Sequence, residues 1–321
     1  MQIAVVEGDG IGHEVIPVAR DVLGLLRPDF EFISVEVGFG RWKQTGEALG
    51  NEEIEQLRSV DAVLFGAVTT PPSPDYQSVV VRIRKSLDLY ANVRPIKGQG
   101  IDITVVRENI EGLYSGIENL ESDRATTLRV VTRHGSERIA RFACTLAKGR
   151  KVTIGHKANV LKSDVFFREI CIRELEKACA PWNERYIDNL CLDVLLHPAE
   201  YHVIVTTNLF GDILSDVAAY LVGGLGLLPS ANIGERHALF EPVHGSAPDI
   251  AGKGIANPIA AIRSAAMLLE YFGDRIHARI VEDAIQAVLS EGIMTRDLGG
   301  TAGTTMFGKA VLRTLSSCKP A

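Results

Sequence analysis

The chain has 321 residues, with 34 Lys and Arg against 40 Asp and Glu, which gives a formal net charge of −6. Hydrophobic residues make up 46% and charged residues 23%, a globular composition that excludes long disorder, collagen and coiled coil. The mildly acidic balance gives no electrostatic basis for nucleic-acid binding. No apolar run is long enough for a membrane span, and from the first residues we expect no secretory signal.

Short apolar runs rich in β-branched residues alternate with amphipathic stretches, which indicates an α/β protein with a mostly parallel core sheet. In chain order we expect a strand at 3–6, a helix at 14–26, a strand at 32–37, a helix at 52–59, strands at 62–65 and 103–106, a helix at 137–146, a strand at 152–156, a helix at 164–178, a strand at 203–206, and helices at 212–221, 258–272 and 278–290.

Residues 115–131 differ from this pattern because a polar acidic stretch is followed by a short segment in which polar and apolar residues alternate. We expect a projecting pair of strands there. It is either a surface hairpin or an arm that pairs with a second chain, since an isolated hairpin is only marginally stable.

The five cysteines show no Cys-x-x-Cys pair and are odd in number, so we expect reduced thiols in a cytoplasmic protein. They are Cys144, Cys171, Cys179, Cys191 and Cys318.

The glycines of Gly8-Asp9-Gly10-Ile11-Gly12 suggest a dinucleotide fingerprint, but the register of G-x-G-x-x-G does not hold. Asp9 would also place a negative charge where a pyrophosphate would bind. A turn that needs glycine for its backbone geometry is the favoured interpretation.

The densest polar motif is residues 208–216, where Asp212 and Asp216 lie four residues apart and share one face of a predicted helix. Their repulsion is relieved by a cation between them, and hard oxygen donors suit Mg²⁺ or Mn²⁺. Asp188 is a third candidate. An acidic helix start that is simply solvated remains the alternative.

Basic side chains form a second set. A helical reading of residues 77–85 places Val80, Val81 and Arg84 on one face, whereas a strand at 79–81 would weaken that argument. Arg94 follows in the segment 91–95, and Arg107 comes directly after the predicted strand 103–106. Arginine binds carboxylates bidentately. Three converging arginines would suit a di- or tricarboxylate, and surface ion pairs are the alternative.

Three further features suit a catalytic cleft. Tyr114 is the first of these features. Lys157 is the second: it comes directly after a predicted buried strand and could act as a base if its pKa were lowered. A long loop rich in Gly and Pro spans 240–258, and loops of this length are usually functional.

With these motifs in hand, the sequence resembles the metal-dependent β-decarboxylating dehydrogenases, which act on isocitrate, homoisocitrate or 3-isopropylmalate. The resemblance runs from residue 8 to residue 300. Its motifs are LDLYANVRP (87–95), VRENIEGLY (106–114), HKANVLK (156–162), NLFGDILSD (208–216) and EPVHGSAPDIAGKGIANP (241–258).

The resemblance implies that family's two-domain, non-Rossmann α/β fold with a protruding dimerisation arm. A large domain would comprise 1–89 and 224–321, and a small domain 90–223 with the arm and the metal-binding helix. The enzyme would be a homodimer, or a tetramer, whose active sites are shared between subunits.

The resemblance also implies residue roles. Tyr114, Lys157 and Asp188 would be catalytic, with Lys157 and Asp188 supplied by the neighbouring subunit. The metal would be bound by Asp188, Asp212 and Asp216. The substrate would be bound by Ser78, Val80, Val81, Arg84, Arg94 and Arg107. The cofactor would be bound by His244, Gly245, Ser246, Ala247, Asp249, Ile250 and Asn257.

Asp249 can accept hydrogen bonds from both ribose hydroxyls and would repel a 2′-phosphate, so we expect NAD as the cofactor. The substrate is less determined. Ser78 and His156 resemble the isocitrate branch, whereas Val80 and Val81 would form an apolar wall suited to an isopropyl group. We favour isocitrate or homoisocitrate over 3-isopropylmalate.

Two other functions remain open. Some members of the family are regulatory subunits without turnover, but these would be expected to lose part of the Tyr, Lys and Asp set kept here. An ordinary Rossmann 2-hydroxy acid dehydrogenase would need the glycine register that fails.

Overall fold

A computed structural model describes residues 1–73, 76–98 and 100–317, which form two compact units. Unit 1 contains Met1–Leu87, Leu225–Ala231 and Arg236–Ala321, and unit 2 contains Asp88–Gly224 and Asn232–Glu235. Within the described residues no helix is both long and apolar enough to cross a bilayer. Cys318 lies outside them, and the described cysteines, Cys144, Cys171, Cys179 and Cys191, are free thiols.

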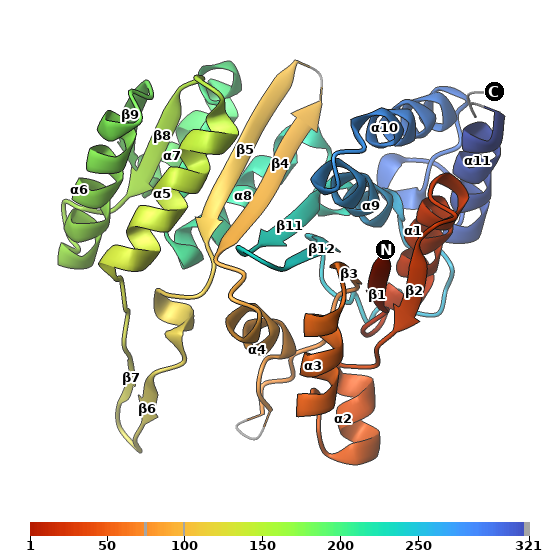
Figure 1. Ribbon diagram of the computed structural model, residues 1–321, viewed down its shortest axis with the longest axis horizontal. Helices are drawn as coiled ribbons and strands as arrows, with labels where there is room; N and C mark the ends of the chain where they lie inside the picture. Colours follow the sequence, from red (N-terminus) through yellow and green to blue (C-terminus); the bar gives the residue numbers. More distant parts are fainter. Residues whose placement is uncertain (74–75, 99, 318–321) are drawn as a thin grey trace. The chain divides into compact units, whose positions relative to one another are not determined.

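Unit 1 is built on parallel strands in the order β2, β1, β3, β12, which lie among helices (Figure 1). Helix α1 forms because its apolar residues recur every three or four positions, and Val15, Ala19, Val22 and Leu23 are all fully buried. The elements of unit 1 are β1 (Gln2–Val6), α1 (Gly12–Leu26), β2 (Glu31–Ser34), α2 (Phe39–Thr45), α3 (Asn51–Ser59), β3 (Ala62–Phe65), α4 (Val79–Ser86), β12 (Ala238–Pro242), α9 (Ile259–Tyr271), α10 (Arg275–Ser290) and α11 (Thr304–Ser317).

Unit 2 has strands in the order β4, β5, β10, β8, β9, of which β4 and β5 pair antiparallel and the others parallel. Its buried apolar cluster includes Val152, Phe167 and Val205. Strand β11 (Pro229–Ile233) contributes residues to both units. The elements of unit 2 are β4 (Ala91–Gly98), β5 (Ile101–Glu108), β6 (Glu118–Leu120), β7 (Ala125–Thr127), α5 (Arg133–Ala147), β8 (Val152–His156), α6 (Lys162–Lys177), β9 (Trp182–Tyr186), α7 (Ile187–Leu196), β10 (Val203–Thr206) and α8 (Asn208–Ala219).

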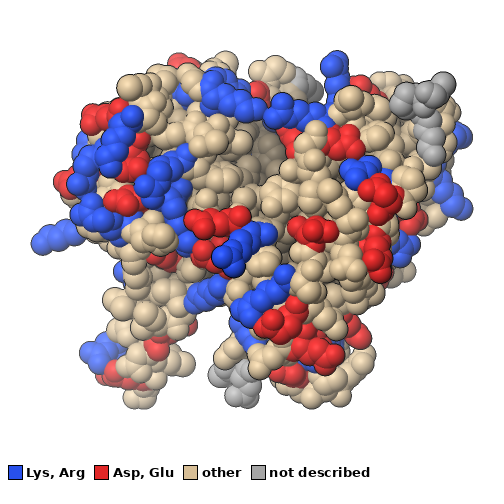
Figure 2. All heavy atoms as spheres, in the orientation of Figure 1, with Lys and Arg blue, Asp and Glu red and all other residues tan. Residues whose placement is uncertain are grey.

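Strands β6 and β7 form an antiparallel arm that projects from unit 2 (Figure 1). Every residue of both strands is exposed. Three large apolar side chains of the arm region are also exposed: Ile117 at 53%, Leu120 at 82% and Leu128 at 55%. Figure 2 shows charged side chains gathered near the free end of the arm, while most of its remaining surface on this face is uncharged.

The predicted α/β fold with a mostly parallel sheet is confirmed. Residues 79–81 lie in helix α4, which decides against the alternative strand. Several predicted boundaries are wrong by three or four residues, including those of α5 and α10, which begin at Arg133 and Arg275 instead of residues 137 and 278. The strand expected at 32–37 ends at Ser34, and the helix expected from residue 212 begins at Asn208, directly after the N-cap Thr207.

Candidate functional site

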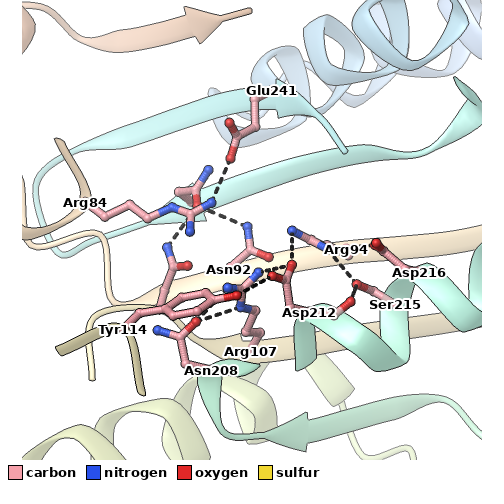
Figure 3. A network of polar contacts seen from close by, with 12 residues as sticks. Arg84, Asn92, Arg94, Arg107, Tyr114, Asn208, Asp212, Ser215, Asp216 and Glu241 are labelled. Carbon is pink, nitrogen blue, oxygen red and sulfur yellow. Dashed lines mark hydrogen bonds and ion pairs between the residues drawn. The ribbon is translucent and has the colours of Figure 1, made fainter. Parts of the chain in front are cut away.

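The acidic pair on α8 lies at the centre of a polar network in unit 2 (Figure 3). The buried strand β10 ends at Thr206, and α8 begins two residues later, so the second and third turns of the helix carry Asp212 and Asp216. The hydroxyl of Tyr114 donates to Oδ2 of Asp212 at 3.0 Å. A catalytic tyrosine candidate and a metal-ligand candidate therefore meet directly.

Two arginines reach the same carboxylate from neighbouring strands. Arg94 lies on β4 and Arg107 on β5, and their side chains are 8% and 1% exposed. Oδ1 of Asp212 lies 3.0 Å from Nη2 of Arg94 and 2.5 Å from Nη1 of Arg107. The register pairs Arg107 with Thr206 at the end of β10, which is why its guanidinium faces the start of α8.

The other N–H groups of Arg94 and Arg107 differ in their hydrogen-bond partners. Arg94 donates to Oγ of Ser215 at 2.7 Å and approaches Oδ1 of Asp216 at 3.4 Å, while its buried Nε has no hydrogen-bond partner among the described residues. Nε and Nη2 of Arg107 both donate to Oδ1 of Asn208. A buried guanidinium with a spare donor suits an anionic ligand, because an unmet buried donor costs free energy.

Asp216 is the more exposed member of the acidic pair, at 52% of its side chain against 31% for Asp212. Partial burial raises the pKa of Asp216, Arg94 opposes that rise, and the charge of Asp212 adds to it. Carboxylate oxygens held together in this way are the hard donors that Mg²⁺ and Mn²⁺ prefer, so the pair fits a divalent cation chemically.

Lys157 and Asp188 form a second polar centre of unit 2. Lys157 follows β8, and its Nζ lies 2.7 Å from Oδ1 of Asp188 in the first turn of α7. The hydrogen bond from Lys157 lowers the pKa of Asp188. Among the described residues of one chain, no three acidic, His or Cys side chains gather closely enough to hold a metal. One chain thus does not unite the three predicted metal ligands.

His156 is buried beside Lys157. Its Nε2 lies 3.3 Å from Oε2 of Glu184, which is also bound by Arg168. Burial lowers the pKa of His156 despite the opposing charge of Glu184. Burial therefore favours the neutral form of the His156 ring.

In unit 1, Arg84 lies on the buried side of α4 and pairs with Glu241, whose Oε1 is 3.2 Å from its Nη2. Its Nε is buried without a partner among the described residues. Ser78 is the N-cap residue of α4, and Val80 and Val81 are half-buried in its first turn. The predicted substrate residues of unit 1 thus occupy one short helix.

The predicted cofactor loop connects β12 with α9 in unit 1. Nδ1 of His244 lies 3.0 Å from the carbonyl oxygen of Gly245, and its buried Nε2 has no partner among the described residues. Burial lowers the pKa of His244, which favours the neutral ring. With the proton on Nδ1, Nε2 is a free acceptor that fits an amino group such as that of adenine.

Other residues of the loop differ in their surroundings. Asp249 is exposed and Ile250 is half-buried, whereas the amide of Asn257 is already engaged, donating to Asp297 at 2.9 Å and accepting from the backbone N–H of Ile259 at 2.9 Å. Gly245 is exposed, Ser246 is buried, and Ala247 adopts a positive φ of 41°.

The glycine turn at residues 8–12 packs against this loop. Gly8 and Gly10 have φ of 73° and 59°, and a Cβ at Gly10 would lie 2.0 Å from the carbonyl oxygen of Ser246. Asp9 accepts backbone N–H bonds from Phe39, Gly40 and Thr69. These contacts support the interpretation of a structural turn.

Sequence reasoning missed two partners of the predicted residues. Glu241 binds Arg84, and Asn208 binds Arg107 and also donates to the carbonyl oxygen of Glu111. Both lie in motifs that were recognised, and Asn208 precedes Asp212 by one helical turn. That spacing is the signal that could have identified it.

Comparison with known proteins agrees with these observations. A family model described as "Isocitrate/isopropylmalate dehydrogenase" matches residues 2–311. The isocitrate/homoisocitrate dehydrogenase of Thermus thermophilus is 47% identical, over 98% of this chain and 99% of that protein. The 3-isopropylmalate dehydrogenase of Archaeoglobus fulgidus is 48% identical, over 97% of this chain and 98% of that protein.

Among solved structures, isocitrate dehydrogenase from Methylococcus capsulatus matches with a TM-score of 0.93 and 41% identity, over 98% of this chain and 99% of that one. Relatives named for different substrates are therefore almost equally similar to this chain. Overall identity indicates the family and does not discriminate among the substrates.

Proposed function

The chain belongs to the isocitrate/isopropylmalate dehydrogenase family of β-decarboxylating dehydrogenases, and on this premise we propose that it oxidises a 3-substituted malate with NAD and Mg²⁺ or Mn²⁺. The products are a 2-oxo acid, CO₂ and NADH. The observation that carries the proposal is the joining of Asp212 to Arg94, Arg107 and Tyr114 in one network.

In this proposal the arginines bind carboxylates. Arg94 and Arg107 hold the malate part of the substrate, and the Nε of Arg94, which has no partner among the described residues, supplies a donor to it. Arg84 is the third arginine that the proposal assigns to the substrate carboxylates. Bidentate arginine–carboxylate contacts fix orientation as well as charge, so they select a hydroxy acid with at least two carboxylates.

Asp212 and Asp216 supply the metal ligands of this chain, and Asp188 of the partner subunit supplies the third. When bound, the cation draws electron density from the C2 oxygen as a Lewis acid and stabilises negative charge there. Lys157 assists removal of the hydroxyl proton. Tyr114 donates a proton to the carbon that has lost CO₂.

For the cofactor, His244 contributes an acceptor to adenine and Asp249 accepts hydrogen bonds from the ribose hydroxyls. The remaining cofactor residues are Gly245, Ser246, Ala247, Ile250 and Asn257. A 2′-phosphate beside the carboxylate of Asp249 would meet like charge, at a cost of about 3 kcal/mol or roughly a hundredfold in affinity. NAD is therefore the proposed cofactor rather than NADP.

We infer a homodimer, because Lys157 and Asp188 serve the partner's active site in this scheme. We also propose a cytoplasmic location, on the basis of the odd number of cysteines without Cys-x-x-Cys pairs. The exposed apolar residues of the arm support a contact with a second chain, as do Leu192 and Leu196 of α7, which are 57% and 61% exposed. A monomer would leave these side chains in water.

Isocitrate and homoisocitrate are the preferred substrates of the proposal, and 3-isopropylmalate is the second candidate. Ser78 can bind a distal carboxylate, which favours the first two. The half-buried Val80 and Val81 provide an apolar surface for an isopropyl group, which favours the third.

Steady-state kinetics with the three acids, each with NAD and with NADP, tests the proposal. We expect turnover of at least one acid with NAD and Mg²⁺, and loss of that turnover in excess chelator that returns when Mg²⁺ is restored. No NAD reduction with any of the acids, or full turnover in excess chelator, would contradict it.

A further inference from the structure

A buried ion pair in unit 2 lies outside the residues assigned so far. Asp164, in the first turn of α6, is fully buried, and its Oδ1 lies 2.5 Å from Nη2 of Arg129, whose side chain is 14% exposed. Arg129 lies two residues after the end of strand β7. A buried carboxylate needs such compensation, since an unpaired charge in the interior is strongly unfavourable.

Asp164 of this ion pair also binds the backbone of Lys157, the proposed catalytic lysine. Oδ2 of Asp164 accepts the backbone N–H of Lys157 at 2.6 Å, at the point where the chain leaves β8. The same carboxylate therefore binds Arg129 with one oxygen and Lys157 with the other. The direction in which the Lys157 side chain leaves the backbone depends on this bond.

Arg129 also reaches the start of the metal-binding helix. Its Nη2 donates to Oγ1 of Thr207 at 3.0 Å, and its Nη1 to Oγ of Ser163 at 3.0 Å. Its guanidinium lies 5.1 Å from the ring centre of Phe210. Thr207 is the N-cap residue of α8, and Phe210 lies in its first turn, so one guanidinium fixes this end of the helix.

The backbone beside Arg129 holds the turn that carries Tyr114. Val130 and Gly112 exchange backbone hydrogen bonds of 2.7 and 3.2 Å, and the hydroxyl of Ser115 donates to the carbonyl oxygen of Leu128 at 2.8 Å. Tyr114 lies between these two attachments, in the short 3₁₀ turn Leu113–Ser115.

We propose that Arg129 and Asp164 are positioning residues that align Lys157, Tyr114 and the N-terminal end of α8. The inference rests on the proposed function, because it concerns residues that have catalytic roles only there. Neither side chain needs to touch the substrate. A displacement of about 1 Å at a catalytic group costs roughly a hundredfold in rate, so loss of this pair lowers kcat.

The first test compares Arg129→Met and Arg129→Lys with Arg138→Met. Arg138 is a matched control in the same unit: its side chain is also 14% exposed, it pairs with Asp88 at 2.9 Å, and its guanidinium lies over the ring of Tyr90. We expect R129M to lower kcat about a hundredfold with little change in the KM for NAD. R129K keeps a charge near Asp164 and should recover part of kcat.

The control separates positioning from general damage. R138M should keep kcat within about threefold of wild type, since Asp88 and Tyr90 hold no catalytic group. Equal losses of kcat in R129M and R138M would overturn the proposal, as would wild-type kcat in R129M.

A double variant separates positioning from stability. Replacing both members of a buried ion pair by apolar residues often restores stability. R129M/D164L should therefore melt closer to wild type than R129M does, while its kcat stays low because the Lys157 N–H has lost its acceptor. Recovery of kcat in parallel with the melting temperature would overturn the proposal.

Hydrogen exchange provides a readout that does not need catalysis. In R129M we expect faster amide exchange at residues 157–161 and 207–211 and unchanged exchange in β4, whereas unchanged exchange at both segments would overturn the proposal. If the wild-type protein turns over none of the three acids, the proposed function fails while this measurement still tests the contacts of Arg129.

Discussion

Replacement of Gly211 by alanine tests the proposed role of Arg107 through a single methyl group. Gly211 lies inside α8, where glycine costs about 1 kcal/mol relative to alanine. The helix carries it because the stem of Arg107 passes alongside. A Cβ at Gly211 would lie 2.6 Å from Cβ and 2.7 Å from Cγ of Arg107.

The size of the effect follows from these distances. Ordinary van der Waals contact begins at 3.4 Å, so either Arg107 or α8 must move by about 0.8 Å. Such a movement disturbs the bonds from Arg107 to Asp212 and Asn208. A misplacement of about 1 Å at an active site costs roughly a hundredfold, so we expect kcat/KM for the hydroxy acid to fall about 30- to 100-fold.

The expected stability change of Gly211→Ala is small. Overpacking costs about 1–3 kcal/mol, and the gain in helix propensity offsets about 1 kcal/mol of it. The assay is steady-state kinetics together with urea unfolding. The KM for NAD should stay unchanged, because the proposed adenosine contacts lie in unit 1.

Two other helical glycines provide matched controls. At Gly24 in α1 the nearest atom to an added Cβ is 3.5 Å away, so Gly24→Ala should be stabilising and fully active. At Gly308 in α11 an added Cβ would lie 2.7 Å from Cγ1 of Val18, so Gly308→Ala should lose stability and keep its activity. If Gly211→Ala keeps wild-type kcat/KM, or if Gly308→Ala loses as much, the role of Arg107 is refuted.

Three further predictions concern stability, assembly and the cofactor. Glu108 is buried, and burial raises its pKa from 4.5 to about 7, so the folded state retains a proton that the unfolded chain has released. Relative to Glu108→Gln, the wild-type free energy of unfolding should therefore fall by up to about 3 kcal/mol between pH 4.5 and pH 7, and parallel urea-unfolding profiles would contradict this. Leu120→Asp should weaken self-association in sedimentation experiments, because Leu120 is 82% exposed on the arm, and an unchanged sedimentation profile would count against the arm as a contact. Asp249→Lys should shift cofactor preference towards NADP by tenfold or more in kcat/KM, whereas equal use of both cofactors by the wild-type protein would remove the basis of this prediction.

The sequence predicted those elements whose own residues determine their structure. Strands β1, β3, β8 and β10 are short apolar runs, and helices α1, α6, α9 and α10 have a periodic apolar face, so local pattern and final environment agree. The acidic pair was predicted for the same reason, since Asp212 and Asp216 lie within one helix whatever its exact start.

Elements stabilised by tertiary contacts were missed. Strand β4 contains Arg94, which is buried only because Asp212 and Ser215 on α8 bind it. Strand β9 has the polar sequence WNERY and forms by pairing with β8. Helix α7 leaves Leu192 and Leu196 exposed. Its apolar residues therefore do not all face the core of unit 2, as they would in a simple amphipathic helix.

The contacts between the site residues could not be predicted from the sequence either. The motifs indicated that Arg107, Tyr114 and Asp212 carry chemistry, but they did not indicate that all three contact one another. The parallel register of β5 with β10 brings Arg107 beside the start of α8. That pairing depends on contacts between strands about a hundred residues apart in the chain, which a single sequence does not specify.

The ratio of NADH to CO₂ formed from the preferred hydroxy acid, in the presence of Mg²⁺, tests the proposed chemistry most directly. Oxidation at C2 followed by loss of the β-carboxylate requires one CO₂ for each NADH, with the 2-oxo acid as the organic product. NADH formation without CO₂, or CO₂ release without NADH, would contradict oxidative decarboxylation by this protein.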